Sequence, residues 1–111
     1  MDSATAAELY ELHARVCKAI ADPKRLLLIN EMRDGAKSVR DLCDAIGISQ
    51  SNASQHLAVL RERGLVRAQR TGNSVYYSLS SPKIVQAVDL LREFLAEDLA
   101  RRGTLGSVAT G

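Results

Sequence analysis

The chain has 111 residues, of which 46% are hydrophobic and 25% are charged, and its formal net charge is +2. These values are typical of one globular domain, and the length leaves no room for a second folded unit. The longest apolar run, residues 26–29, is far shorter than the roughly 20 residues that a membrane span needs. The first residues lack the basic and apolar segments of a signal peptide. We therefore expect a cytoplasmic protein with no membrane partner, whose two cysteines stay reduced.

Capping residues and apolar spacing predict two helices at the start of the chain. Thr5, with Glu8 three residues later, forms a capping-box pattern, so the first helix is expected over about 5–21. An aspartate followed by proline at 22–23 is a typical helix start, because proline is tolerated at the first helical position. The second helix is expected over about 23–34.

Two shorter helices follow, and the turn between them is tight. Ser38 caps the first, which is predicted to stop at Gly47, and Ser49 caps the second, which is predicted to end at Gly64. A turn of three or four residues that contains glycine is the connection found in helix-turn-helix units. The residues expected on the two buried stripes are Val39, Leu42, Cys43 and Ile46, followed by Ala53, Leu57 and Leu60.

After Gly64 the pattern changes from helical spacing to alternation. Residues 65–70 and 75–79 are predicted strands, and the Thr-Gly-Asn-Ser segment between them is a turn by composition, so together they form a hairpin. Ser81, followed by proline, starts a last helix that is expected to end near Arg102. An isolated hairpin is not stable alone, so this one must pack on the helices.

The order of these elements predicts a mainly α fold with a β-hairpin wing, in which a single domain spans 1–103 and a disordered polar tail spans 104–111. The first and last helices each carry an apolar stripe that the helix-turn-helix unit does not need. Pairing of these stripes across a two-fold axis predicts a homodimer. The alternative is that both stripes fold back on the core of one chain. The stripe residues are Leu9, Leu12, Val16 and Ile20, and then Ile84, Val88, Leu91, Leu95 and Leu99.

The second helix of the helix-turn-helix unit has a side that is suited to the edges of bases. This side carries short side chains that donate and accept hydrogen bonds, and the first two turns contain no acidic residue that phosphates would repel. Such side chains pair with bases in the major groove of double-stranded DNA. The candidates for this contact are Gln50, Ser51, Asn52, Ser54, Gln55 and His56.

The hairpin region is basic. Residues 61–81 contain four arginines and one glutamate, which is a local charge of +3 in a chain whose total is +2. Arginines beside a turn of small polar residues are typical of a wing that contacts phosphates or the minor groove. The candidates for this contact are Arg67, Arg70 and Asn73.

Taken together, these motifs resemble the ArsR/SmtB family of winged helix-turn-helix repressors. The resemblance implies a homodimer joined through its first and last helices, which binds a palindromic DNA operator and is released by an inducer. It extends over residues 21–80 and rests on four segments, DPKRL at 22–26, SQSNASQHL at 49–57, LRERGLV at 60–66 and GNSVYYSL at 72–79.

The metal sites that the resemblance implies are not complete in this sequence. Ser38 and Arg40 occupy the positions of a thiolate pair, and of a second set of four ligands only Glu97 remains. The positions of a sulfur-sensing cysteine pair hold Asn30 and Leu95. We therefore assign no metal site.

Cys17, Cys43 and His13 remain as a candidate inducer or redox site. His13 and Cys17 are four residues apart and share a helical face. With a further thiol they could bind trivalent arsenic or zinc, and two cysteines brought together could form a reversible disulfide. The alternative is that the cysteines belong to the core and that the regulator has no metal or thiol switch.

Two other classes of protein are less consistent with the sequence. A winged-helix module that binds protein would carry acidic or bulky apolar residues on the exposed side of residues 49–64, where polar residues stand instead. An enzyme is not expected, because the sequence has no Cys-x-x-Cys motif, glycine-rich phosphate loop or paired carboxylates.

Overall fold

The structure, a computed structural model, describes residues 3–103, and the tail predicted over 104–111 lies outside this range. The mainly α fold with a β-hairpin is confirmed. The elements follow in the order α1 (Ser3–Ile20), α2 (Pro23–Glu31), β1 (Lys37–Ser38), α3 (Val39–Ile46), α4 (Gln50–Glu62), β2 (Val66–Thr71), β3 (Ser74–Leu79) and α5 (Pro82–Arg102).

Four helices begin at the residue that the sequence predicts. Asp22, Ser38, Ser49 and Ser81 are the N-caps of α2, α3, α4 and α5, and each side chain accepts a hydrogen bond from a backbone N–H of the first turn. The predicted start of α1 is wrong by two residues, because the helix begins at Ser3 and Thr5 lies within it. An alanine-rich sequence favours helix strongly enough to extend it past the capping-box pattern.

The second helix is shorter than predicted, and a strand that was not predicted follows it. α2 ends at Glu31, and a turn leads to the two-residue strand β1, whose Lys37 and Ser38 pair with Tyr77 and Tyr76 of β3. The chain must leave the helix early because these two residues need an extended backbone. The result is an antiparallel three-stranded sheet in the order β1-β3-β2.

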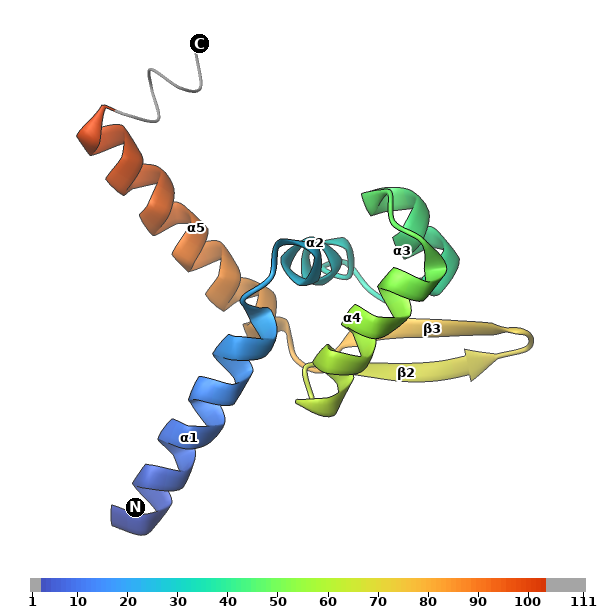
Figure 1. Ribbon diagram of the computed structural model, residues 1–111, viewed down its shortest axis with the longest axis horizontal. Helices are drawn as coiled ribbons and strands as arrows, with labels where there is room; N and C mark the ends of the chain where they lie inside the picture. The colour runs from blue at the N-terminus through green and yellow to red at the C-terminus, as the bar shows by residue number, and fades with distance from the viewer. Residues whose placement is uncertain (1–2, 104–111) are drawn as a thin grey trace.

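The predicted hairpin is confirmed, with strand ends that differ by one residue. Its register runs from Val66 opposite Leu79 to Thr71 opposite Ser74, which leaves Gly72 and Asn73 as a two-residue loop. Gly72 has a φ of +62°, a conformation that residues with a Cβ adopt at a cost. The hairpin extends well beyond the helices (Figure 1).

The core lies where α2, α3 and α4 meet. Within it, the predicted stripe of α4 is fully buried and the α3 stripe contributes Leu42, while Val39, Cys43 and Ile46 pack against the same core. The side chains with no exposed surface come from these three helices and are Leu28, Ile29, Leu42, Ala53, Leu57 and Leu60.

Helices α1 and α5 diverge from this body on the side opposite the hairpin (Figure 1). The radius of gyration is 16.5 Å, whereas a compact chain of this length would have about 13 Å. The outer halves of both apolar stripes are exposed, so the alternative in which they fold back on the core is wrong for those halves. The exposed large side chains of the two helices are Leu9, Tyr10, Leu12, Leu90, Leu91, Phe94 and Leu95. Within residues 3–103, no helix has the length and hydropathy to cross a membrane.

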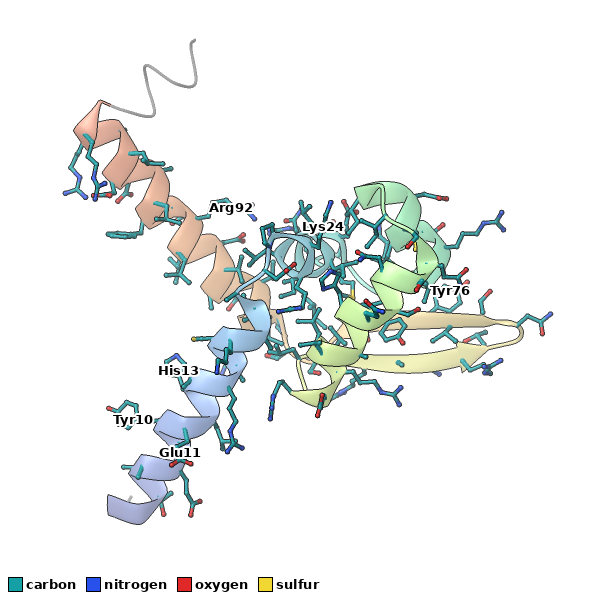
Figure 2. All side chains as sticks on the ribbon, viewed as in Figure 1. Tyr10, Glu11, His13, Lys24, Tyr76 and Arg92 are labelled. Carbon is teal, nitrogen blue, oxygen red and sulfur yellow. The ribbon has the colours of Figure 1, made fainter. Side chains whose placement is uncertain are left out.

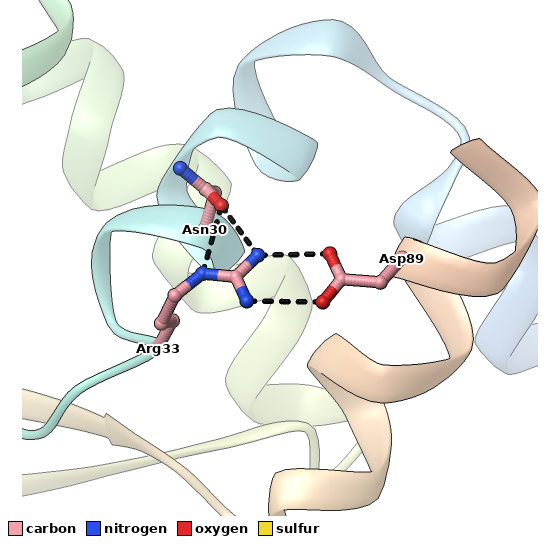
Figure 3. A network of polar contacts seen from close by, with 3 residues as sticks. All are labelled: Asn30, Arg33 and Asp89. Carbon is pink, nitrogen blue, oxygen red and sulfur yellow. Dashed lines mark hydrogen bonds and ion pairs between the residues drawn. The ribbon is translucent and has the colours of Figure 1, made fainter. Parts of the chain in front are cut away.

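A paired arginine connects α5 to the end of α2 (Figure 3). The Arg33 guanidinium donates two hydrogen bonds to the Asp89 carboxylate, at 3.0 and 2.8 Å, and also donates to Oδ1 of Asn30 at 3.2 and 2.8 Å. The side-chain hydrogen bond from Arg33 is the main reason that the pKa of Asp89 lies below its ordinary value, and it outweighs the opposing effect of partial burial. The geometry is the bidentate form in which arginine binds carboxylate best.

This contact predicts a pH-dependent part of the stability. Because the folded-state pKa of Asp89 is lowered, its contribution is present above the unfolded value of about 3.9 and is lost as the pH falls through the folded value. We expect Asp89→Asn to lower the urea midpoint at neutral pH, by a margin that shrinks in acid. Unfolding followed by circular dichroism over a pH series measures this margin. Glu97→Gln, on the same helix and without an ion pair in the described part of the chain, is the control. An acid-independent margin for Asp89→Asn contradicts the prediction.

Candidate nucleic-acid interface

The two sides of α4 differ sharply. Ala53, Leu57 and Leu60 have no exposed surface and pack the helix onto the core. The opposite side of the first two turns is open to solvent, and the exposed side chains there are Gln50, Ser51, Ser54 and Gln55. These four predicted site residues therefore lie together on the exposed side of the helix, and Asn52 is half-buried beside them.

The turn before α4 sets the position of this side. Gly47 ends α3 with a φ of +70°, and its N–H donates to the Cys43 carbonyl at 2.8 Å. The N–H of Ile48 donates to the same carbonyl at 3.2 Å. Ser49 then caps α4, with its Oγ accepting from the N–H of Asn52 at 3.1 Å. The N–H groups of Gly47 and Ile48 therefore both have a partner, and hydrogen bonds within the connection help to hold the angle between α3 and α4.

His56, the sixth predicted contact on α4, occupies a different position. Only 17% of its side chain is exposed, and Nη1 of Arg25 donates to its Nδ1 at 3.2 Å. A guanidinium has no acceptor, so this contact requires the imidazole proton to sit on Nε2. The ring thus faces the start of α2, apart from the four exposed residues of α4.

Arg25 contacts the end of α1 as well as His56. Its Nε donates to the carbonyl of Ala19, while Nη1 reaches His56 on α4. Asp22 lies next to both, with its Oδ1 4.0 Å from Nδ1 of His56. Sequence reasoning missed this role of Arg25, because its partner on α4 is 31 residues away and no local pattern points to it.

The electrostatic environment of Asp22 is consistent with this arrangement. Partial burial alone would raise the pKa of its carboxyl, but hydrogen bonds from the N–H groups of Arg25 and Lys24 act in the other direction. The nearby guanidinium charge of Arg25 adds to their effect, and the pKa of Asp22 is lowered as a result. The N-cap therefore stays ionised at neutral pH, where it suits the positive end of the α2 dipole.

The three predicted wing residues are exposed, but they do not share one face. Side chains alternate along a strand, so Arg67 and Arg70 of β2 point to opposite faces of the hairpin. Arg70 is on the face that carries Val66 and Ala68, which nearer the body turns toward the core. Asn73 lies in the loop at the tip. Within residues 3–103, neither arginine has a carboxylate at ion-pair distance.

The candidate inducer residues are divided between two places. His13 and Cys17 line an apolar groove of about 490 Å³ between α1 and α5, and Cys17 is exposed. Figure 2 shows His13 and Tyr10 on the side of α1 turned away from the hairpin. Cys43 does not line this groove and packs against the core from α3. In the part of the chain that the structure describes, no three His, Cys, Asp or Glu side chains form a group that could hold a metal ion.

The two cysteines also differ chemically. Burial, followed by the negative charge of Asp44, raises the pKa of the Cys43 thiol. Metal binding and disulfide exchange require the thiolate, so Cys43 is poorly suited to either. Cys17 is the more accessible of the two.

Known proteins resemble this chain in both sequence and structure. The family described as "Bacterial regulatory protein, arsR family" matches residues 22–68. The HTH-type transcriptional regulator NmtR of Mycobacterium tuberculosis is 40% identical over 89 residues, which are 80% of this chain and 71% of that protein. A biofilm growth-associated repressor of Xylella fastidiosa is 38% identical over 78 residues, covering 70% of this chain and 68% of that protein.

A solved structure of similar shape is the homodimeric winged helix-turn-helix DNA-binding domain of Mb0332 from Mycobacterium bovis, determined in solution. It superposes with a TM-score of 0.79 at 30% identity and covers 91% of this chain and 93% of that one. The helix-turn-helix unit formed by α3 and α4, with the hairpin beside it, defines a winged helix-turn-helix transcriptional regulator. The chain belongs to the ArsR family of bacterial regulatory proteins.

Proposed function

We propose that this ArsR-family regulator is a homodimeric repressor that binds a palindromic DNA operator and is released by an inducer. The observation that carries the proposal is the exposed, acid-free, hydrogen-bonding side of α4 next to a hairpin whose arginines have no acidic partner among the described residues 3–103. Glutamine and serine side chains match base edges in the major groove, and unpaired arginines match phosphates. The name of the Xylella fastidiosa relative, a repressor, agrees with this direction of control.

Each candidate residue has a role in this proposal. The exposed side of α4 would contact bases, and the wing would contact the sugar-phosphate backbone or the minor groove. His56 would position α4 through Arg25, because its ring faces α2. The proposed base contacts are Gln50, Ser51, Asn52, Ser54 and Gln55, and the proposed wing contacts are Arg67, Arg70 and Asn73.

The dimer is argued from the uncovered apolar surface. Leu90, Leu91 and Phe94 are 65%, 62% and 55% exposed on α5, and Leu9 and Leu12 are similarly exposed on α1. Exposed apolar side chains in such number are unfavourable in water and typical of an interface. A two-fold axis through this surface would set two copies of α4 about one turn of DNA apart, which fits a palindrome. The homodimeric state of the Mb0332 domain supports the same arrangement.

DNA binding predicts different effects for a base contact and a phosphate contact. Gln55→Ala should weaken operator binding by about 1–3 kcal/mol and relax the preference at one position, because a side chain that pairs with a base is lost. Arg70→Ala should weaken all sequences alike and reduce the slope of log K against log salt by about one. Fluorescence anisotropy would measure both, on DNA from upstream of the gene or on a duplex selected from a random library.

The control for this experiment is Glu97→Gln, which lies on α5 and away from α4 and the wing. It should leave the base preference unchanged. An unchanged salt slope in Arg70→Ala would contradict the role given to the wing. Failure of the wild-type protein to select any duplex would contradict the proposed function as a whole.

The dimer predicts a clear difference between two leucine substitutions. Leu91→Asp should convert the dimer to a monomer, because it would place a charge in the interface, whereas Leu27→Asp, at an exposed leucine of α2, should not. Sedimentation equilibrium measures the mass, which for the wild type should be twice that of one chain. A monomeric wild type, or a dimeric Leu91→Asp variant, would refute the interface.

The candidate site for the inducer is the thiol of Cys17, because it is exposed and lies in the proposed interface. Cys17 lies in the groove between α1 and α5 together with His13, so a ligand or oxidant that modifies it would disturb the packing of two copies. We propose that release by trivalent arsenic or by an oxidant acts through Cys17. Cys43 lies against the core with its thiolate disfavoured, and we give it a structural role.

This role predicts that reduced wild-type and Cys17→Ser proteins bind the operator equally well, because serine conserves the size of the side chain. Arsenite or an oxidant should then release the wild type and the Cys43→Ala control but not Cys17→Ser. Anisotropy of the preformed complex gives the released fraction. Equal release of Cys17→Ser, or no release of any protein, would assign the response to an inducer that does not use this thiol.

A further inference from the structure

A second concave surface lies between α1 and the end of α4, away from the apolar groove. It encloses about 380 Å³ and is lined by five residues. Two of them, Ala19 and Val59, are apolar, and the other three are cationic. The cationic residues are Arg15 and Lys18 from α1 and Arg63 at the C-terminal cap of α4. We call this surface the basic cleft.

The cations of the basic cleft have no acidic partners in the part of the chain that the structure describes. Within residues 3–103, Arg15, Lys18 and Arg63 take part in no ion pair and no side-chain hydrogen bond. Three other exposed arginines do have acidic partners, since Arg33 binds Asp89 and both Arg101 and Arg102 bind Asp98, whereas the wing residues Arg67 and Arg70 resemble the cleft in having none within residues 3–103. Three like charges around one concavity repel each other unless an anion lies between them.

The chemistry of the three donors suits a phosphate group. Arg15 and Lys18 are three residues apart and lie on one face of α1, so they approach an anion from one side. Arg63 approaches from another helix. Two guanidinium groups offer planar pairs of N–H donors that match two oxygens of a phosphate, and the ammonium adds a mobile third contact. Ala19 and Val59 add no negative charge that would oppose an anion.

We propose that the basic cleft binds a phosphate group and thereby bridges α1 and α4. Two sources of that group are compatible with the surface. One is a sugar-phosphate strand of the operator beyond the contacts of the first turns of α4, and this source rests on the proposed function. The other is a small phosphorylated molecule, which needs no DNA. In either case, binding would connect the helix with the exposed apolar stripe to the helix proposed to contact bases.

The first experiment tests the cleft without DNA. Pyrophosphate is titrated into the full chain at constant ionic strength and followed by calorimetry or NMR chemical shifts. Lys18→Ala/Arg63→Ala should bind at least about tenfold more weakly than the wild type, since two charge-assisted hydrogen bonds are lost. Arg101→Ala/Arg102→Ala removes the same charge from the end of α5 and should bind as the wild type does. Both changes are at exposed positions, and circular dichroism verifies the fold.

The second experiment tests DNA as the source. Operator binding of the same two variants is measured over a salt series. If the cleft contacts the backbone, Lys18→Ala/Arg63→Ala lowers the salt slope by about one to two, and the control variant does not. Saturable pyrophosphate binding that depends on the cleft, with an unchanged salt slope, assigns the site to a small phosphorylated molecule.

The proposal is overturned if both experiments give the wild-type result for Lys18→Ala/Arg63→Ala. It is also overturned if the control variant loses as much pyrophosphate affinity and as much salt slope as the cleft variant, because the effect would then be one of net charge alone. Failure of the wild type to bind any operator would refute the proposed function and would exclude DNA as the source of the phosphate group. The pyrophosphate titration would still decide whether the cleft binds phosphate.

Discussion

The packing of α4 onto the core is the constraint on which the rest of the site depends. Ala53, Leu57 and Leu60 have no exposed surface, and they fix the rotation of the helix about its own axis. Successive residues of a helix are about 100° apart, so a slip of one position would turn the polar side toward the core and bury unpaired amides and hydroxyls. The position of the hydrogen-bonding side chains is therefore a consequence of apolar packing on the other side. The capped turn after Gly47 then holds the start of α4, and the contact between Arg25 and His56 holds its middle.

Helix α2 connects the divergent helices to α4. Near its start, Arg25 contacts the last turn of α1 and the side chain of His56. Just beyond its end, Arg33 binds Asp89 of α5 in a bidentate pair. The body of α2 contributes Leu28 and Ile29 to the core that α4 packs against. A change in how α1 and α5 are held would thus reach α4 through two arginines that are attached to one short and well-packed helix.

The features that the sequence predicted well are those whose cause is local. Ser38 and Ser49 cap helices through hydrogen bonds to residues three positions away, and the stripe of α4 follows from spacing alone. The features that it missed depend on partners far along the chain. No alternation in two residues could predict β1, and nothing near Arg25 or Arg33 identifies a partner 31 or 56 residues away. Periodicity also identifies an apolar stripe without showing what covers it. Only the structure shows that the apolar side chains on the outer parts of α1 and α5 are exposed.

The alternation of β2 has a consequence for how the wing would meet DNA. Its two arginines, Arg67 and Arg70, point to opposite faces of the two-stranded ribbon, and the minor groove of B-form DNA has a phosphate wall on each side. A ribbon that approached such a groove edge-on would offer one cation to each of the two phosphate walls. The ribbon would then be held in the groove by one charged contact on each of its two faces. Moving Arg67 by one position along β2 would bring both cations to the same wall and leave the other without a charged contact.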